Sequence, residues 1–235
     1  MKLLLISNST NAGETYLSHP REAIARFLAP AVKKVLFFPY AAVTFSYEEY
    51  EAKVAERFRE FGVEVESIHR LPSPREAVSK AEAIVVGGGN TWQLTRMLHD
   101  LGLIDAIREK VLTGTPFIGW SAGANVACPT IRTTNDMPIV DPDGLHAFNL
   151  VPFQINPHYL DANPEGHAGE TREQRIQEFI EINPDLYVVG LREGTMLRII
   201  NKKVDLIGPR SARIFRKGQL PTEVLPGGEL GFLME

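Results

Sequence analysis

Short apolar runs alternate with amphipathic segments through the first half of the chain, and this alternation restricts the folds that the chain can adopt. Five of the runs are typical of buried strands, namely 3–6, 35–38, 63–68, 83–86 and 116–120. Repeated alternation of strand and helix is typical of βαβ units arranged around a parallel sheet. We therefore expect an α/β fold in three layers, with a doubly wound, mostly parallel sheet between two layers of helices.

The segment between the second and third runs has the clearest helical pattern. Its apolar residues recur at helical spacing: Tyr47, Tyr50, Val54, Phe58 and Phe61. Ser46 and Glu49 stand at the two positions of a capping box, and Gly62 is a typical helix stop. Asn90 is a candidate cap for a further helix that begins at residue 91.

The second half of the chain has a different character. Residues 128–169 are rich in Pro, Asn, Asp and Gly, and a loop region of that length is usually functional. Thr171 and Gln174 form a second capping box, before a helix over about 172–182. The segments 202–208 and 212–218 are expected to form a small antiparallel ribbon at the C-terminal end.

Composition excludes several classes of function. The 235 residues, 44% of them hydrophobic, can bury one sizeable core, and we expect a single domain over 1–235. A net charge of −4 without a long basic stripe argues against a nucleic-acid partner. No segment approaches the roughly 20 apolar residues that span a membrane. The first apolar run is too short for a signal peptide, and the single cysteine, Cys128, excludes an internal disulfide, so we expect a cytoplasmic protein with a small ligand.

A serine stands between two glycines directly after the fifth predicted strand. In "GWSAGAN", residues 119–125, Ser121 follows an apolar run and precedes small residues that can begin a helix. A strand, a sharp turn and a helix in that order are the context of a nucleophile elbow. The small neighbours leave room for the turn and for the backbone N–H of Ala122 to stabilise an oxyanion. We interpret Ser121 as a nucleophile rather than a structural serine.

The glycine-rich turn "GGGNT", residues 87–91, follows the fourth predicted strand. Glycines allow backbone N–H groups to approach a ligand closely, so this turn could supply an oxyanion hole or cradle a phosphate. It lacks the Lys followed by Ser or Thr of a Walker loop, and it lacks the G-x-G-x-x-G spacing of a dinucleotide site. A plain turn that leads into a helix is an equally good interpretation of the motif alone.

A nucleophilic serine needs a base and an acid that orients the base. Of six histidines, His158 is the best candidate, because it directly follows a short strand-like run in "QINPH". Two acids compete for the third role: Asp136 in the long loop after the serine, and Glu193 after the apolar run "LYVVG".

Two other chemistries fit the residues less well. His158, Asp161, His167 and Glu170 are close in sequence, but their spacing matches no zinc pattern. Cys128 has apolar neighbours, which are typical of an inert buried thiol rather than a nucleophile.

Two arginines are candidates for substrate binding. Arg172 lies in the first turn of the predicted helix, where the helix dipole disfavours a cation, so a ligand could explain its position. A guanidinium binds a carboxylate through two parallel hydrogen bonds. Arg132 is a second candidate, and an exposed surface arginine is the alternative for both.

Five motifs in a fixed order resemble those of the peptidase E family of α-aspartyl dipeptidases. They are "GGGNT" at 87–91, "GWSAGAN" at 119–125, "RTTNDMPIVDP" at 132–142, "QINPH" at 154–158 and "EGHAGETREQR" at 165–175. The resemblance extends to the N-terminal "LLLISNST". It implies a cytoplasmic serine peptidase that cleaves dipeptides with an N-terminal aspartate. It also implies a relation to cyanophycinases and a fold similar to class I glutamine amidotransferases.

The resemblance assigns a role to each motif. It implies that Ser121 is the nucleophile, that His158 is the general base, and that Glu193 or Asp136 is the acid. It further implies that Arg172 binds the aspartate side chain of the substrate.

The oxyanion donors that the resemblance implies are the N–H groups of Gly88 or Gly89, together with Ala122. No metal or organic cofactor is expected, and the protein would act as a monomer or a homodimer. Two alternatives stay open: an esterase of the α/β-hydrolase type, and a non-catalytic domain that binds an anion.

Overall fold

Seven strands form the central sheet of the computed structural model, which describes residues 1–163, 165–166 and 168–235. The strand order is β3-β2-β4-β5-β1-β8-β9. The bounds are Lys2–Ile6 for β1, Lys34–Phe38 for β2, Glu64–Ser67 for β3, Ile84–Val86 for β4, Phe117–Trp120 for β5, Met196–Ile200 for β8 and Lys203–Ile207 for β9. The first five strands are parallel, and β8 and β9 extend the sheet in antiparallel pairing, so the predicted mostly parallel sheet is confirmed.

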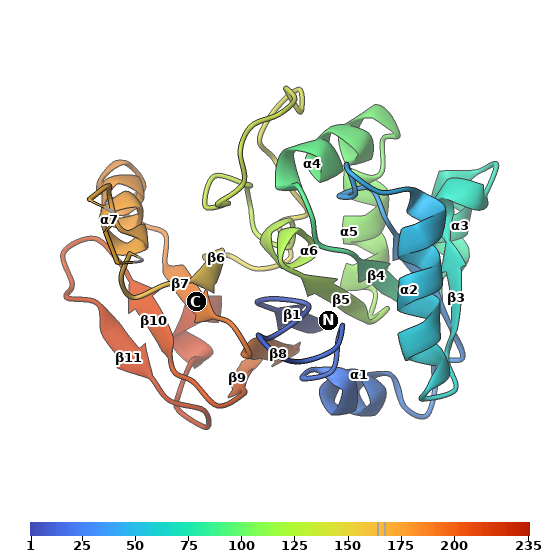
Figure 1. The fold of residues 1–235 in the computed structure, drawn as a ribbon, viewed down its shortest axis with the longest axis horizontal. Helices are drawn as coiled ribbons and strands as arrows, with labels where there is room; N and C mark the ends of the chain where they lie inside the picture. Colours follow the sequence, from blue (N-terminus) through green and yellow to red (C-terminus); the bar gives the residue numbers. More distant parts are fainter. Residues whose placement is uncertain (164, 167) are drawn as a thin grey trace.

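Helices cover both faces of this sheet (Figure 1). Their bounds are Arg21–Leu28 for α1, Tyr47–Arg59 for α2, Pro74–Lys80 for α3, Thr91–Asp100 for α4, Ile104–Leu112 for α5, Ala122–Asn125 for α6 and Arg172–Ile182 for α7. Alternate residues of the buried strands point to opposite faces. Leu4 of β1 and Phe37 of β2 pack with α1 and α2, whereas Leu3 and Leu36 pack with α3, α4 and α5. The three-layer prediction is therefore confirmed.

The expected helix caps are present. Ser46 and Glu49 form both bonds of the capping box that begins α2, and Thr171 and Gln174 do the same for α7. The side chain of Asn90 accepts a hydrogen bond from the N–H of Gln93 at the start of α4. Because these bonds satisfy backbone donors that have no partner within the helix, they fix where each helix begins.

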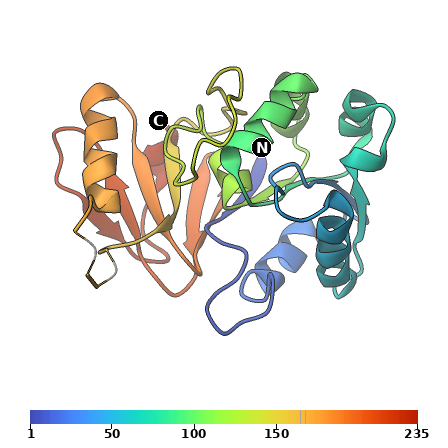
Figure 2. The same ribbon diagram turned by 45° about the horizontal axis from the view of Figure 1, so that its top comes forward.

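A second sheet of four strands, in the order β11-β10-β7-β6, lies beside the first and is drawn at the left of Figure 1. The strands are β6 (Gln154–Tyr159), β7 (Val188–Arg192), β10 (Ala212–Phe215) and β11 (Thr222–Val224). Of these, β6 and β7 are parallel, and α7 packs over them (Figure 2). The segments expected as one C-terminal ribbon are both strands, but they pair in different sheets: β9 with β8, and β10 with β7 and β11.

The connection between the sheets places three strand ends together. The turn 193–195 leads from β7 in the second sheet directly into β8 in the first. The ends of β5, β6 and β7 therefore meet where the sheets adjoin, as the arrangement in Figure 1 shows. Within the described ranges, no helix is long and apolar enough to cross a membrane.

Candidate active site

Ser121 occupies a strained turn between β5 and α6. Its backbone angles are φ 53° and ψ −114°, a conformation that residues with a side chain rarely adopt. The turn requires glycine on either side. A Cβ on Gly119 would lie 2.1 Å from the carbonyl oxygen of Gly123, and a Cβ on Gly123 would lie 2.1 Å from that of Val86. The sequence around Ser121 thus forms the strand, sharp turn and helix that were expected.

Ser121, His158 and Glu193 form a continuous hydrogen-bonded chain. Nε2 of His158 lies 3.0 Å from Oγ of Ser121, and Nδ1 of His158 lies 2.7 Å from Oε1 of Glu193. The side chains of His158 and Glu193 are about two-fifths exposed, at 39% and 40%, so a substrate can reach them. This geometry allows the imidazole to take the serine proton while the carboxylate fixes its orientation.

Asp136, the other acid considered for this role, binds elsewhere. Its Oδ2 accepts hydrogen bonds from the N–H of Thr91 at 2.7 Å and from the hydroxyl of Thr91 at 2.5 Å. Its carbonyl oxygen accepts a hydrogen bond from Nε1 of Trp92 at 3.1 Å. Asp136 therefore holds the long loop against the N-terminus of α4, and Glu193 is the carboxylate that contacts the imidazole.

The three backbone N–H groups considered as oxyanion donors belong to the turn after β4 and to the residue after Ser121. A Cβ on Gly88 would lie 3.0 Å from Cβ of Ser121, so the glycine-rich turn passes directly beside the serine. Gly89 has φ +136° and a Cβ there would meet the carbonyl oxygen of Ala41 at 2.2 Å, so only glycine fits. In the described part of the chain, no protein group accepts a hydrogen bond from the N–H of Gly88, Gly89 or Ala122.

Tyr50 holds the peptide unit between Gly88 and Gly89, although its helical spacing in the sequence indicates only a core residue of α2. Its hydroxyl donates to the carbonyl oxygen of Gly88 at 2.9 Å and accepts from Nε1 of Trp120 at 3.0 Å. A trans peptide unit points its C=O and N–H in opposite directions, so the N–H of Gly89 points away from Tyr50. Burial raises the pKa of Tyr50 to about 12, which keeps the hydroxyl protonated. The hydroxyl of Tyr50 therefore fixes the direction of the N–H of Gly89.

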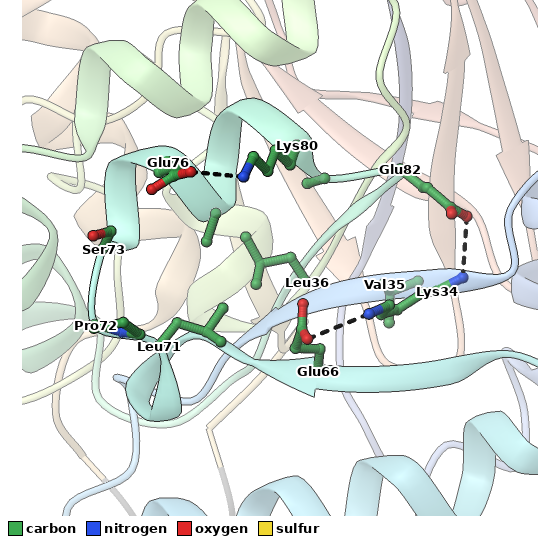
Figure 3. Close-up of a pocket in the computed structure, with 12 residues that line it drawn as sticks. Lys34, Val35, Leu36, Glu66, Leu71, Pro72, Ser73, Glu76, Lys80 and Glu82 are labelled. Atoms are coloured by element: carbon green, nitrogen blue, oxygen red, sulfur yellow. Dashed lines mark hydrogen bonds and ion pairs between the residues drawn. The ribbon is translucent and has the colours of Figure 1, made fainter.

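Ser121 lies in a cavity, and a second cavity of similar volume is separate from it. The cavity of about 330 Å³ contains Ser121 and His158. Its other lining residues are Thr91, Thr134, Asn135, Asp136, Pro157 and Arg172. The cavity of about 370 Å³ lies between α3 and the strands β2 and β3 (Figure 3), where its charged groups pair with one another, as in Lys34 with Glu66.

Arg172 brings a positive charge into the serine cavity. Burial lowers the pKa of its guanidinium, Arg175 lowers it further, and the carboxylate of Asp136 acts in the opposite direction. Among the described residues, no carboxylate lies within 4.0 Å of Arg172. A half-buried guanidinium without an ion-pair partner is poorly solvated, so it favours an anionic ligand.

Arg132 does not join this site. It is exposed, its Nη1 lies 3.5 Å from Oδ1 of Asn183 beyond the end of α7, and it does not line the serine cavity. Its prediction as a second substrate-binding arginine therefore has no support in the geometry.

Comparisons with known proteins show which family this chain resembles. The sequence model described as "Peptidase family S51" matches residues 3–207. A peptidase E from Nostoc sp. is 53% identical over 234 residues, covering 100% of this chain and 97% of the relative. A peptidase E from Salmonella typhimurium is 49% identical over 219 residues, covering 93% and 95%.

The chain belongs to peptidase family S51.

Two solved structures share the fold of this S51 chain. A peptidase from an acI-B1 actinobacterium has a TM-score of 0.69 at 18% identity and covers 97% of this chain, which in turn covers 96% of it. A putative peptidase E from Listeria monocytogenes has a TM-score of 0.57 at 24% identity, with coverage of 95% and 98%. The α/β fold predicted from the sequence is thus shared with both of these structures.

In the part of the chain that the structure describes, the alternative chemistries have no structural support. Asp161 binds Arg192 through two hydrogen bonds, and His167 lies outside the described residues. No group of three possible metal ligands occurs in the ranges that the structure describes. Cys128 is fully buried, and burial raises the pKa of its thiol to about 12, so it is not an activated nucleophile.

Proposed function

We propose that the protein is a serine dipeptidase that hydrolyses dipeptides with an N-terminal aspartate. The observation that carries the proposal is that Arg172, without an ion-pair partner among the described residues, lines the same cavity as Ser121 and His158. Arg172 would bind the β-carboxylate of the substrate with its planar fork of donors. The scissile carbonyl would then lie against Oγ of Ser121.

The proposed reaction begins with acyl transfer to Ser121. Nε2 of His158 takes the proton from Oγ as this oxygen attacks the peptide carbonyl, and Glu193 stabilises the imidazolium that forms. The N–H groups of Gly89 and Ala122 would stabilise the oxyanion. The C–N bond then breaks, and the leaving amine receives the proton from His158. Water, activated by the same imidazole, releases the aspartyl group and restores the serine.

Asp136 would recognise the free α-ammonium group of the substrate. Oδ2 of this residue accepts both bonds from Thr91, no described residue donates a hydrogen bond to Oδ1, and Asp136 lines the cavity. A free α-ammonium group carries the complementary charge and lies close to the β-carboxylate of an aspartyl residue. We therefore expect a requirement for a free N-terminus, which restricts the enzyme to N-terminal aspartate.

An α/β-hydrolase esterase is less well supported. In that fold the acid precedes the histidine in the chain, in the order serine, acid, histidine. Here Glu193 contacts His158 and follows it in the chain. A non-catalytic anion-binding domain would not require the two hydrogen bonds that join Ser121 to Glu193 through His158.

A panel of X-Leu dipeptides, with and without an N-acetyl group, tests the proposal. We expect Asp-Leu to be the best substrate and N-acetyl-Asp-Leu to be resistant. Ser121→Ala, which removes only Oγ, is the control, and it should fold normally and show no turnover. Turnover in that variant, or equal cleavage of the acetylated peptide, would count against the proposed site.

A further inference from the structure

Three consecutive residues at the end of β1 each bind the backbone of a different part of the triad. The carbonyl oxygen of Ile6 accepts from the N–H of Ser121 at 3.0 Å. Oγ of Ser7 accepts from the N–H of His158 at 3.0 Å, and Oδ1 of Asn8 accepts from the N–H of Gly194 at 2.8 Å. Because Gly194 directly follows Glu193, one short segment contacts the chain at all three members of the triad.

Ser7 is fully buried, and its hydroxyl both donates and accepts a hydrogen bond. The hydroxyl donates to the carbonyl oxygen of Leu191 at 2.7 Å, so its lone pairs remain to accept from His158. Its backbone N–H donates to the carbonyl oxygen of Thr195 at 3.0 Å. These bonds join the end of β1 to both sides of the turn that carries Glu193.

The backbone of His158 needs such a partner. It has φ 53° and lies at an irregularity in β6, between Pro157 and Tyr159, where the register with β7 shifts. A bulge leaves its extra residue outside the ladder of paired strands. The hydroxyl of Ser7 accepts a hydrogen bond from the N–H of His158, which the bulge leaves unpaired in the sheet. This bond helps to fix the distance between the imidazole and Ser121.

Asn8 acts in the same way on the acid. It is fully buried, and its amide nitrogen donates to the carbonyl oxygen of Thr10 and to Oδ1 of Asn11, both at 2.9 Å. These two bonds orient the amide so that Oδ1 faces the N–H of Gly194. Gly194 has φ +82°, a conformation that a tight turn requires and that a held N–H helps to maintain.

We propose that Ser7 and Asn8 are positioning residues that set the distances between Ser121, His158 and Glu193. The proposal rests on the proposed function, since it assumes that this triad performs the reaction. Neither side chain lines the serine cavity, so neither contacts the substrate. Their loss should slow the chemical step and leave substrate binding unchanged. A misplacement of about 1 Å in a catalytic group can lower a rate about 10²-fold.

The experiment compares Ser7→Ala and Asn8→Ala with a matched control, Ser67→Ala. Ser67 is also fully buried, and its hydroxyl binds Nδ1 of His69 at 2.7 Å, at the far edge of the central sheet. Each variant is checked for cooperative thermal unfolding. Two quantities are then measured: the rate constant for covalent labelling of Ser121 by a small alkyl fluorophosphonate, and kcat and KM for Asp-Leu. His158→Ala is the reference for loss of the base.

We expect labelling and kcat to fall about 10-fold or more in Ser7→Ala and Asn8→Ala, with KM within about twofold of the unmodified protein. Ser67→Ala should change neither rate by more than about twofold. Labelling and kcat at the unmodified level in either folded variant, with slow labelling in His158→Ala, would overturn the positioning role alone. Fast labelling in His158→Ala would overturn the proposed function. If Ser7→Ala does not fold, Asn8→Ala decides between the same outcomes.

Discussion

Nδ1 of His158 lies 2.7 Å from Oε1 of Glu193, and this contact joins the end of β6 to the turn after β7. The two strands are parallel neighbours in the second sheet, so their ends lie side by side. The contact therefore follows from strand pairing rather than from proximity in the sequence. It also leaves Nε2 of the same imidazole free to face Ser121, as a general base must.

Replacement of the two acids should separate their roles. Glu193→Gln keeps the size of the side chain but removes its charge, so we expect kcat to fall by roughly 10²–10⁴-fold. Asp136→Asn should leave kcat within about tenfold and mainly raise KM, because Asp136 contacts Thr91 rather than the imidazole. Steady-state kinetics on Asp-Leu measures both. A larger loss of kcat in Asp136→Asn than in Glu193→Gln would reverse the assignment.

Tyr50→Phe should weaken the oxyanion hole. The change removes the hydroxyl that fixes the carbonyl of Gly88, so the N–H of Gly89 is no longer held in one direction. Since removal of an oxyanion donor lowers turnover by about 10²–10³-fold, loss of its orientation should lower kcat by about tenfold with KM unchanged. Tyr40→Phe, on the loop after β2, is the control and should behave like the unmodified protein. An unchanged kcat in Tyr50→Phe would exclude this role.

Gly123→Ala should destabilise the fold around the serine turn. The added Cβ would lie 2.1 Å from the carbonyl oxygen of Val86, so α6 would have to move away from β4. We expect the free energy of unfolding to decrease by about 3 kcal/mol or more, the upper end of overpacking effects. Gly231→Ala, whose Cβ would have no neighbour closer than 3.9 Å, should change it little. Chemical denaturation compares the two, and equal stabilities would show that the close approach is not required.

Glu223 should stabilise the folded protein only at pH values at which its carboxyl group is ionised. Hydrogen bonds from Arg192, the main cause, and from Ser211 and Arg213 lower its pKa from 4.5 to about 2, and burial acts in the opposite direction. A carboxyl whose pKa is lower in the folded state stabilises the fold above the unfolded value of 4.5, and this effect is lost as the pH falls toward 2.

In Glu223→Gln, the free energy of unfolding should therefore depend less on pH between 4.5 and 2 than in the unmodified protein. Glu229→Gln, an exposed carboxylate on the same C-terminal segment, is the control. Parallel pH profiles for the unmodified protein and Glu223→Gln would contradict the proposed ion-pair network around Arg192.

Much of the fold could be predicted because local signals agree with it. The capping residues Ser46, Asn90 and Thr171 begin helices where the sequence predicts them. The pairing of the last strands could not be predicted, because β9 and β10 are similar in sequence pattern and only packing assigns them to different sheets. A single domain, a cytoplasmic location and a monomeric or dimeric state stay predictions.

Some residues of the site could likewise be predicted from the sequence, and others could not. Ser121 and His158 follow predicted strands, so their meeting at one rim could be anticipated. The choice of Glu193 depends on the pairing of β6 with β7, which no local pattern encodes. Tyr50 has the spacing of an ordinary core residue, and only its contact with Gly88 indicates a second role. Arg132 and Arg172 look alike in sequence, yet only Arg172 lines the cavity.

Recognition of the substrate carboxylate by Arg172 is measured by the ratio of kcat/KM for Asp-Leu to that for Asn-Leu, two substrates of nearly equal size that differ in charge. When Asn-Leu is bound, the half-buried charge of Arg172 has no carboxylate partner, and this costs binding free energy. We therefore expect a ratio of about 10² or more. In Arg172→Met the ratio should fall to near one, whereas Arg132→Met should preserve it. A ratio near one in the unmodified protein would contradict the binding of the substrate carboxylate by Arg172.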